Sequence, residues 1–365
     1  MRIMFYTQLL NMGGMERTVT SLSNELVNDN EITIVQYTSI PPFFTLDNRV
    51  KYIQLGFISD GLSKVSKAYK LIKLLRTEII NSRTQAIFCM NKSHLLFLKI
   101  AKFGLNSVLI GTERTNPQAE KSIRAISDRF FAKLSDGFVF QTARSMIAYP
   151  KSVRDIACVI PNAICNPDVL LNVPNKNKRE EIVAAGRLTK NKGFDILIKA
   201  FSRICNMIPD YKLTIFGEGE DRDRLEAIIL EEGLSNKINL PGKDLHAFQY
   251  IMNSSIFVLS STIEGMPNSL IEAMACGIAC ISTNCDFGPA ELITDGFNGI
   301  LTPVNDVQAL AAAVLRVATN ENLRLSLGRN AYMIRDELSI DKISQRWLEY
   351  CKQLYIEKYN ESTEG

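Results

Sequence analysis

Short apolar segments alternate with longer segments of helical periodicity along almost the whole chain. In the first half the predicted strands are Arg2–Tyr6, Glu31–Tyr37, Ala86–Met90, Ser107–Gly111 and Gly137–Gln141. Helical patterns lie between them, for example at Glu16–Val27 and Leu62–Ile80. Strands separated by helices predict βαβ units, and therefore a parallel sheet that is covered by helices on both faces.

The alternation is interrupted once and then resumes. Residues 166–178, rich in Asn, Lys and Pro, are predicted to form an interdomain linker. The later predicted strands are Glu181–Ala185, Lys212–Phe216, Ile238–Leu240, Ser255–Ser260, Ile278–Thr283 and Gly299–Leu301. The later predicted helices are Gly193–Ile208, Asp221–Glu232, Ser269–Cys276, Asp306–Ala318, Glu321–Glu337 and Lys342–Lys358.

This pattern predicts two doubly wound, Rossmann-like α/β domains, which suits a length of 365 residues. We assign residues 1–165 to the first domain and 179–340 to the second. The helix at 341–358 is expected to cross back to the first domain, and 359–365 form a tail. Because such sheets bind ligands beyond the carboxyl ends of their strands, we expect a site in a central cleft that the two domains face.

The charges are distributed unevenly between the two halves. The net charge is +3, but residues 1–150 hold 19 basic and 11 acidic residues, while the remainder holds 23 and 28. A basic first half favours an anionic ligand or an anionic membrane surface. No nucleic-acid-binding pattern accompanies it, so a nucleic-acid partner is not expected.

The apolar residues and the cysteines exclude other classes of protein. No apolar run approaches the ~20 residues of a membrane span, and the N-terminus does not resemble a signal peptide. We therefore expect a cytoplasmic protein. Eight cysteines in such a chain do not predict disulfides, and Cys276, Cys280 and Cys285 lack the spacing of a metal site. No metal and no cofactor are predicted.

Three glycine-rich loops follow predicted strands. Gly13-Gly14 opens a helix, where exposed amides favour an anion, although a plain turn explains the same residues. The segment 186–193 carries Arg187 and Lys192, a pair suited to a diphosphate, although a solvated basic loop explains it too. Gly217 and Gly219 form a third turn that could approach a nucleotide.

The fourth motif, at 264–272, is the strongest. Gly265 and Pro267 predict a tight turn, and Asn268 or Ser269 is expected to cap the following helix. Glu264 and Glu272 flank that turn, where carboxylates can accept hydrogen bonds from the vicinal hydroxyls of a sugar or ribose. An ordinary capped helix with two surface glutamates explains the same pattern.

Together these motifs resemble glycosyltransferase family 4, the retaining enzymes of the GT-B fold, of the bacterial surface-polysaccharide type. The resemblance also includes Val159-Ile160-Pro161-Asn162 and the segments 273–277 and 295–299, and it spans nearly the whole chain in order. It implies a nucleotide-sugar donor, held mainly by the second domain, and an acceptor held by the first. It also implies that no divalent metal is needed.

The resemblance implies a role for each matching residue. Arg187 and Lys192 match ligands of the donor diphosphate, Glu272 the ribose-binding glutamate, and Glu264 the glutamate beside the transferred sugar. The amides of Met266, Asn268 and Ser269, with Pro267 in their turn, are expected near the sugar or phosphate. The amides of Gly13 and Gly14 are expected near the diphosphate, and Gly217 and Gly219 near the donor.

One departure concerns the histidine that many family members carry after a strand of the first domain. The matching position here reads Gly111-Thr112-Glu113-Arg114, without histidine. Glu113 or Arg114 is the expected catalytic replacement. His94 follows the preceding strand, and we expect it to have an unspecialised surface role.

The predicted acceptor is a lipid-linked oligosaccharide on a polyprenyl diphosphate, at the inner face of the cytoplasmic membrane. Leu62–Ile80 places Val65, Ala68, Ile72, Leu75 and Ile79 on one side of a helix. Lys67, Lys70, Lys73 and Arg76 lie around the other side, which suits an anionic membrane surface. The apolar stripe is also what docking onto a sheet requires.

The function that follows is a retaining, metal-independent glycosyltransferase for O-antigen, capsule or exopolysaccharide synthesis. Its donor is predicted to be UDP-linked, since UDP-sugars are common among similar proteins. Two alternatives stay open: a nucleotide-sugar epimerase of the same fold, and a non-catalytic scaffold. The first lacks the histidines expected around a sugar, and the intact set of Arg187, Lys192, Glu264 and Glu272 argues against the second.

Overall fold

The structure is a computed structural model that describes residues 1–10, 13–56, 63–114, 117, 129–165, 179–243 and 247–359. The chain divides into two compact units. Unit 1 comprises Met1–Cys165 together with Leu338–Gly365, and unit 2 comprises Asn166–Glu337. The linker predicted at 166–178 lies outside the described residues, as does the tail beyond Tyr359.

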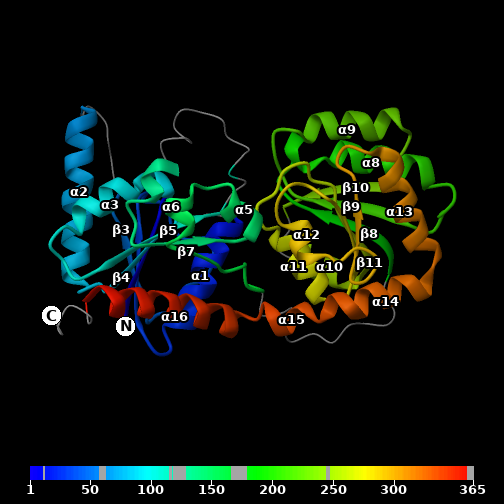
Figure 1. Cartoon of the computed structure of the whole chain (residues 1–365). Coiled ribbons are helices and arrows are strands. Elements are labelled where there is room, and N and C mark those ends of the chain that lie inside the picture. The colour runs from blue at the N-terminus through cyan, green and yellow to red at the C-terminus, as the bar shows by residue number, and fades with distance from the viewer. Residues whose placement is uncertain are drawn as a thin grey trace. The chain divides into compact units, whose positions relative to one another are not determined.

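Unit 1 contains a seven-stranded parallel sheet with the order β3-β2-β1-β4-β5-β6-β7 (Figure 1). Its strands are β1 (Arg2–Thr7), β2 (Glu31–Gln36), β3 (Lys51–Gln54), β4 (Ala86–Cys89), β5 (Val108–Glu113), β6 (Gly137–Phe140) and β7 (Ala157–Val159). Its helices are α1 (Gly14–Leu26), α2 (Lys64–Asn81), the short η1 (Lys92–His94), α3 (Leu95–Ala101), α5 (Ala143–Ile147), α6 (Lys151–Arg154) and α16 (Ile340–Tyr359).

Alternate strand residues of unit 1 face opposite sides of the sheet, and each side has its own helices. On one side, Met4 and Tyr6 belong to a buried cluster with residues of α2 and α3. On the other, Phe5 and Phe88 contact the fully buried Trp347 of α16, with ring centroids 6.5 and 4.8 Å apart. The last helix of the chain is therefore part of the core of unit 1.

Unit 2 contains a six-stranded parallel sheet with the order β10-β9-β8-β11-β12-β13. Its strands are β8 (Arg179–Ala185), β9 (Lys212–Phe216), β10 (Ile238–Gly242), β11 (Ser254–Leu259), β12 (Ala279–Thr283) and β13 (Ile300–Thr302). Its helices are the short η2 (Lys190–Lys192), α8 (Phe194–Ile204), α9 (Arg222–Glu231), α10 (Ala247–Asn253), α11 (Asn268–Ala275), α12 (Pro289–Leu292), α13 (Val307–Thr319), α14 (Glu321–Tyr332) and α15 (Ile334–Glu337).

The two sheets confirm the predicted fold class of two doubly wound α/β domains with parallel strands. In unit 2, buried residues of α8, α9 and α13 share one core with the central strands. Each strand order reverses direction once, between β1 and β4 in unit 1 and between β8 and β11 in unit 2. Loops diverge at such a switch point, which leaves a crevice beyond the carboxyl ends of the two strands.

Some elements differ from the prediction. The strands β3 and β7 were not predicted, because they are only four and three residues long; each pairs with a single neighbour. The helix predicted at Glu321–Glu337 is two helices, α14 and α15.

The buried stripe of α2 also differs from the prediction. Leu71, Leu75 and Ile79 are buried, whereas Val65 is 79% exposed. At 3.6 residues per turn, Val65 lies about 80° around the helix from Leu75, outside the face that meets the sheet. The predicted place of Val65 in the buried stripe is therefore wrong.

Candidate functional site

The most developed polar site of unit 2 lies at the carboxyl ends of β8 and β11, the two strands at its switch point. The loop 186–193 follows β8 and contains η2, and the segment 260–264 follows β11. Backbone bonds join the two loops, including one of 2.8 Å from Thr262 N to Asn191 O. These two loops therefore lie where a ligand-binding crevice is expected at a switch point.

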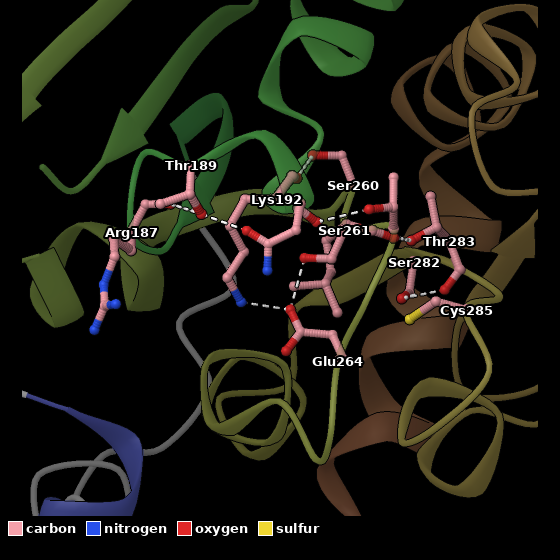
Figure 2. Close-up of polar contacts among 12 residues, drawn as sticks. Arg187, Thr189, Lys192, Ser260, Ser261, Glu264, Ser282, Thr283 and Cys285 are labelled. Carbon is pink, nitrogen blue, oxygen red and sulfur yellow. Dashed lines mark hydrogen bonds and ion pairs between the residues drawn. The ribbon is translucent and has the colours of Figure 1, made fainter. Parts of the chain in front are cut away.

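Lys192 and Glu264 form an ion pair across these two loops (Figure 2). Lys192 Nζ lies 2.6 Å from Glu264 Oε1, and the Ser261 hydroxyl donates a 2.6 Å hydrogen bond to the same oxygen. The Glu264 side chain is 9% exposed and that of Lys192 is 22% exposed. The lysine side chain is therefore partly exposed, and a buried carboxylate, which itself accepts a hydrogen bond from the buried Ser261 hydroxyl, holds it in place.

The backbone around Lys192 is fixed by close packing against β11. Gly193 has φ of 62°, in the left-handed region, and a Cβ atom there would overlap the carbonyl oxygen of Ser260. The Ser260 hydroxyl donates a 2.9 Å hydrogen bond to the Lys192 carbonyl. The Thr283 hydroxyl bonds to the Ser261 carbonyl from the neighbouring strand β12. Lys192 and Ser261 are thus anchored on three adjacent strands.

Arg187 is placed differently from Lys192, although both belong to the same loop. Its residue is exposed, and in the described part of the chain its guanidinium makes no hydrogen bond or ion pair. Figure 2 shows the side chain of Arg187 extending out of the loop, apart from the Lys192–Glu264 pair. Of the two residues predicted to bind the diphosphate, Lys192 is thus held by a neighbouring side chain, and Arg187 is exposed on the surface.

Close packing requires glycine at positions 217 and 219, in addition to the predicted approach of these residues to the donor. Gly217 has φ of 141°, and a Cβ atom there would overlap the Gly186 carbonyl oxygen. A Cβ atom at Gly219 would overlap the Leu188 carbonyl oxygen. Backbone bonds of 2.9 Å, from Gly186 N to Phe216 O and from Leu188 N to Glu218 O, join the two loops. These glycines let the loop after β9 close onto the loop that contains Lys192.

The remaining donor residues predicted in unit 2 lie at the start of α11. Pro267 is the extended residue before the helix, and Asn268 and Ser269 are its first two residues. Met266 precedes the proline and is buried. Glu272 lies one turn into α11 and is 7% exposed, so it is not one of two surface glutamates. The turn packs closely against Gly288, since a Cβ atom at Gly288 would overlap the carbonyl oxygen of Gly265.

The cysteines of unit 2 are buried free thiols. Cys276, Cys280 and Cys285 all belong to its interior. Burial raises the pKa of the Cys285 thiol to about 12, with a smaller contribution from the nearby Glu264 carboxylate. The thiol is therefore neutral at physiological pH. Within the described ranges, no three His, Cys, Asp or Glu side chains are grouped so that they could hold a metal ion.

The predicted residues of unit 1 lie at the carboxyl edge of its own sheet. Gly13 precedes α1, and Gly14 is the first residue of that helix. A Cβ atom at Gly13 would overlap the Glu16 carboxylate, so the absence of a side chain leaves room for that carboxylate beside the glycine. This helix start therefore has an acidic side chain of its own close to the two glycines.

Glu113 is the last residue of β5 and is 2% exposed. Its Oε2 lies 2.5 Å from Lys92 Nζ and accepts a 2.5 Å hydrogen bond from the Tyr149 hydroxyl. Removal of either partner would leave part of a buried charge uncompensated. The carboxylate is thus built into the interior of unit 1.

Arg114 lies next to Glu113 but has different neighbours. Its Nη2 donates a 2.9 Å hydrogen bond to Asn162 Oδ1, and its guanidinium lies 5.8 Å from the ring centroid of Trp347. Asn162 also accepts a 2.6 Å bond from Gln141. Burial lowers the pKa of Arg114 to about 10, so the group is still a cation at neutral pH.

His94 has a structural role rather than the surface role expected from the sequence. Its Nδ1 lies 2.6 Å from the hydroxyl of the buried Tyr6. The rings of Tyr6, Tyr37 and Phe97 surround it at centroid distances of 5.4–5.6 Å. The other histidine, His246, lies outside the described residues.

Three residues that were not predicted as site residues contact the Glu264 and Glu113 carboxylates. Ser261 contacts Glu264, and both Lys92 and Tyr149 contact Glu113. Ser261 directly follows a predicted strand, which is a usable signal for a site residue. Tyr149 has no such signal, because its contact with Glu113 depends on how β6 and α5 pack.

A comparison with protein families identifies the chain. Residues 171–333 match the family described as Glycosyl transferases group 1. The matched segment belongs to this glycosyltransferase family. Its two parallel-sheet units have the GT-B fold that similar solved structures share.

Individual relatives of this glycosyltransferase come from bacterial polysaccharide synthesis. It is 27% identical over 362 residues to a Campylobacter jejuni GalNAc-alpha-(1->4)-GalNAc-alpha-(1->3)-diNAcBac-PP-undecaprenol alpha-1,4-N-acetyl-D-galactosaminyltransferase, covering 97% of this chain and 99% of the relative. It is 23% identical over 346 residues to the amylovoran biosynthesis glycosyltransferase AmsD of Erwinia amylovora, covering 92% and 95%.

Among solved structures, HepE of Anabaena in complex with UDP and glucose is similar in fold. The TM-score is 0.77 at 19% identity, over 96% of this chain and 98% of that chain. TarM gives a TM-score of 0.80 at 16% identity, over 96% and 98%. At such identities the likeness concerns the fold alone.

Proposed function

We propose that this glycosyltransferase moves a sugar from a UDP-sugar to a lipid-linked oligosaccharide in bacterial surface-polysaccharide synthesis, with retention of configuration and without a divalent metal. The observation that carries the donor half is the Lys192–Glu264–Ser261 arrangement at the switch point of unit 2. The Campylobacter jejuni relative, whose name contains an undecaprenol diphosphate glycan, supports the acceptor half.

The proposed chemistry is mainly electrostatic. When the bond between the sugar and the phosphate breaks, its electron pair passes to the phosphate oxygen, and the diphosphate gains negative charge. The Lys192 ammonium is already fixed by Glu264, so it stabilises this charge without reorganising. Arg187 supplies a second cation from the surface of the same loop. Amides at the start of α11 add favourable dipoles.

The carboxylates of Glu264 and Glu272 have separate tasks in this proposal. Glu264 accepts a hydrogen bond from the transferred sugar, and Glu272 accepts hydrogen bonds from the ribose. The acceptor hydroxyl attacks the sugar from the face that the diphosphate leaves, and its proton passes to the departing phosphate oxygen. No separate enzymatic base is then required.

A transfer assay tests this proposal. Purified protein is incubated with UDP- and GDP-sugars and undecaprenyl diphosphate-linked oligosaccharides, with and without EDTA. We expect nucleotide release only with acceptor, an α-linked product from an α-linked donor by NMR, and the same rate in EDTA. Interconversion of the donor sugar without acceptor would favour an epimerase, and binding without turnover a scaffold. An inverted product or loss of activity in EDTA would contradict the proposed mechanism.

We further propose that α2 binds the anionic surface of the membrane that carries the acceptor. Lys70 and Lys73 are exposed and Lys67 is partly exposed, while Val65 and Tyr69 lie exposed beside them. Arg76 does not belong to this cationic surface as predicted, because its Nη1 bonds to the carbonyls of Ala101 and Phe103 at 2.9 and 2.7 Å. No helix in the described ranges has the length and apolar character of a membrane span.

Replacing Lys67, Lys70 and Lys73 by Gln should weaken binding to anionic liposomes and leave UDP affinity unchanged. Each charge near such a surface contributes at most about 1 kcal/mol, and added salt should reproduce the effect. Co-sedimentation with phosphatidylglycerol vesicles measures the binding. The matched control replaces the exposed Lys199, Lys212 and Lys352 by Gln. Equal co-sedimentation of both triple variants would remove α2 from the proposal.

A further inference from the structure

The switch point of unit 1 also brings polar side chains together. Gln8 follows β1, and Asn91 and Lys92 follow β4, the neighbouring strand on the other side of the reversal. Asn91 Nδ2 donates a 3.0 Å hydrogen bond to Gln8 Oε1, which joins the two strand ends. Lys92 is thus held in the part of a doubly wound sheet where ligands bind.

The contacts of Lys92 repeat those of Lys192 in unit 2. In each unit a lysine follows one strand at or beside the switch point, and a buried glutamate comes from the neighbouring strand. One oxygen of Glu113 meets Lys92 Nζ and the Tyr149 hydroxyl, both at 2.5 Å. One oxygen of Glu264 meets Lys192 Nζ and the Ser261 hydroxyl, both at 2.6 Å.

In both units the lysine side chain is more exposed than the glutamate side chain. The Lys92 side chain is 18% exposed and that of Glu113 is 2% exposed. The lysine side chain is therefore more accessible to a substrate than the carboxylate is. An ammonium has three N–H donors, and the contact with Glu113 uses one of them. Among the described residues, the geometry provides a fixed point charge with N–H donors left over, which suits a phosphate oxygen.

We propose that Lys92 binds a phosphate oxygen of a substrate diphosphate, and that Glu113 and Tyr149 are positioning residues for it. This rests on the proposed function, which supplies two possible diphosphates, one in the donor and one in the lipid-linked acceptor. It also changes the role predicted for Glu113, from a replacement of the missing histidine to a support for the neighbouring lysine.

Binding measurements with two probes test the proposal. The double variant K92Q/E113Q removes the ammonium together with the charge that it compensates, so no buried carboxylate is left alone. We expect it to bind either UDP or undecaprenyl diphosphate at least about tenfold more weakly than the wild type, which corresponds to one charge-assisted hydrogen bond. If only the affinity for UDP falls, Lys92 binds the donor diphosphate. If only the affinity for undecaprenyl diphosphate falls, Lys92 binds the acceptor diphosphate.

The matched control is K102Q/D136N. Lys102 and Asp136 form an ion pair of 3.0 Å in the same unit, but Asp136 immediately precedes β6, at the amino edge of the sheet. Its affinities should equal those of the wild type. Unchanged binding of both probes by K92Q/E113Q, or an equal loss in the control, would overturn the proposal. If the wild-type protein binds neither probe, the proposed function fails and this inference fails with it.

A measurement on the wild-type protein avoids any effect of the variants on folding. Reductive methylation followed by mass spectrometry reports how accessible each lysine is. UDP or undecaprenyl diphosphate should slow the methylation of Lys92 at least about threefold and leave the exposed Lys151 unchanged. An equal rate at Lys92 with and without both probes would overturn the proposal.

Discussion

The variant Lys192→Ala should lower kcat/KM by about two to three orders of magnitude. Removing one group that stabilises transition-state charge typically costs about 2.7–4 kcal/mol. The full effect is expected here because Glu264, which also accepts a hydrogen bond from Ser261, holds the ammonium before substrate arrives. Both kcat and donor affinity should fall, since the diphosphate is charged in the ground state and more strongly charged in the transition state. Steady-state kinetics with varied UDP-sugar measures the effect.

Two comparisons make this result specific to Lys192. Lys190 lies in the same turn and is exposed, so Lys190→Ala should retain the wild-type kinetics. Arg187→Ala should lower kcat/KM less than Lys192→Ala does, because no neighbour in the described ranges holds its guanidinium. Lys192→Ala leaves the buried Glu264 unpaired, so thermal unfolding must show that the variant is folded at the assay temperature. Normal kinetics in a folded variant would remove Lys192 from the donor site.

The local parts of the fold were predictable from the sequence, because each buried strand has its own apolar run and is followed by a polar or glycine-rich loop. The strand at Lys212–Phe216 was predicted with the bounds that the structure has. The loops that contain Lys192 and Glu264 could be placed at strand ends for the same reason. The prediction failed for the very short strands β3 and β7 and for the side of α2 that meets the sheet.

Contacts between distant segments could not be predicted. Lys92 and Glu113 are 21 residues apart, and Tyr149 lies another 36 residues along the chain. Nothing in their local sequence indicates that they meet, because the contact arises from strand order and helix packing. The glycines at 217 and 219 have a second role that the sequence did not indicate. Their pattern predicts close approach to a nucleotide, and the structure also requires them for the packing of one loop on another.

The two glutamates of the 264–272 motif should have different effects on turnover and on UDP affinity when each is changed to glutamine. Glu264→Gln should reduce turnover at least about tenfold while UDP affinity stays equal or rises. Lys192 then loses its ion-pair partner and becomes more available to the diphosphate. Oε1 of Glu264 is already engaged by Lys192 and Ser261, and the described residues provide no donor for Oε2. That oxygen is the one left to meet the sugar, which UDP lacks.

Glu272→Gln should instead weaken UDP and UDP-sugar equally, by about tenfold or more, because the ribose contact is common to both ligands. A carboxylate acceptor contributes about 1.5–3 kcal/mol where a neutral amide contributes about 1 kcal/mol. Calorimetry with UDP, combined with kinetics, distinguishes the two variants, and the exposed Glu231→Gln in α9 is the matched control. If Glu264→Gln weakened UDP and Glu272→Gln spared it, the two carboxylates would have to exchange roles. The donor would then lie reversed along the switch point of unit 2, with its sugar rather than its ribose beside α11.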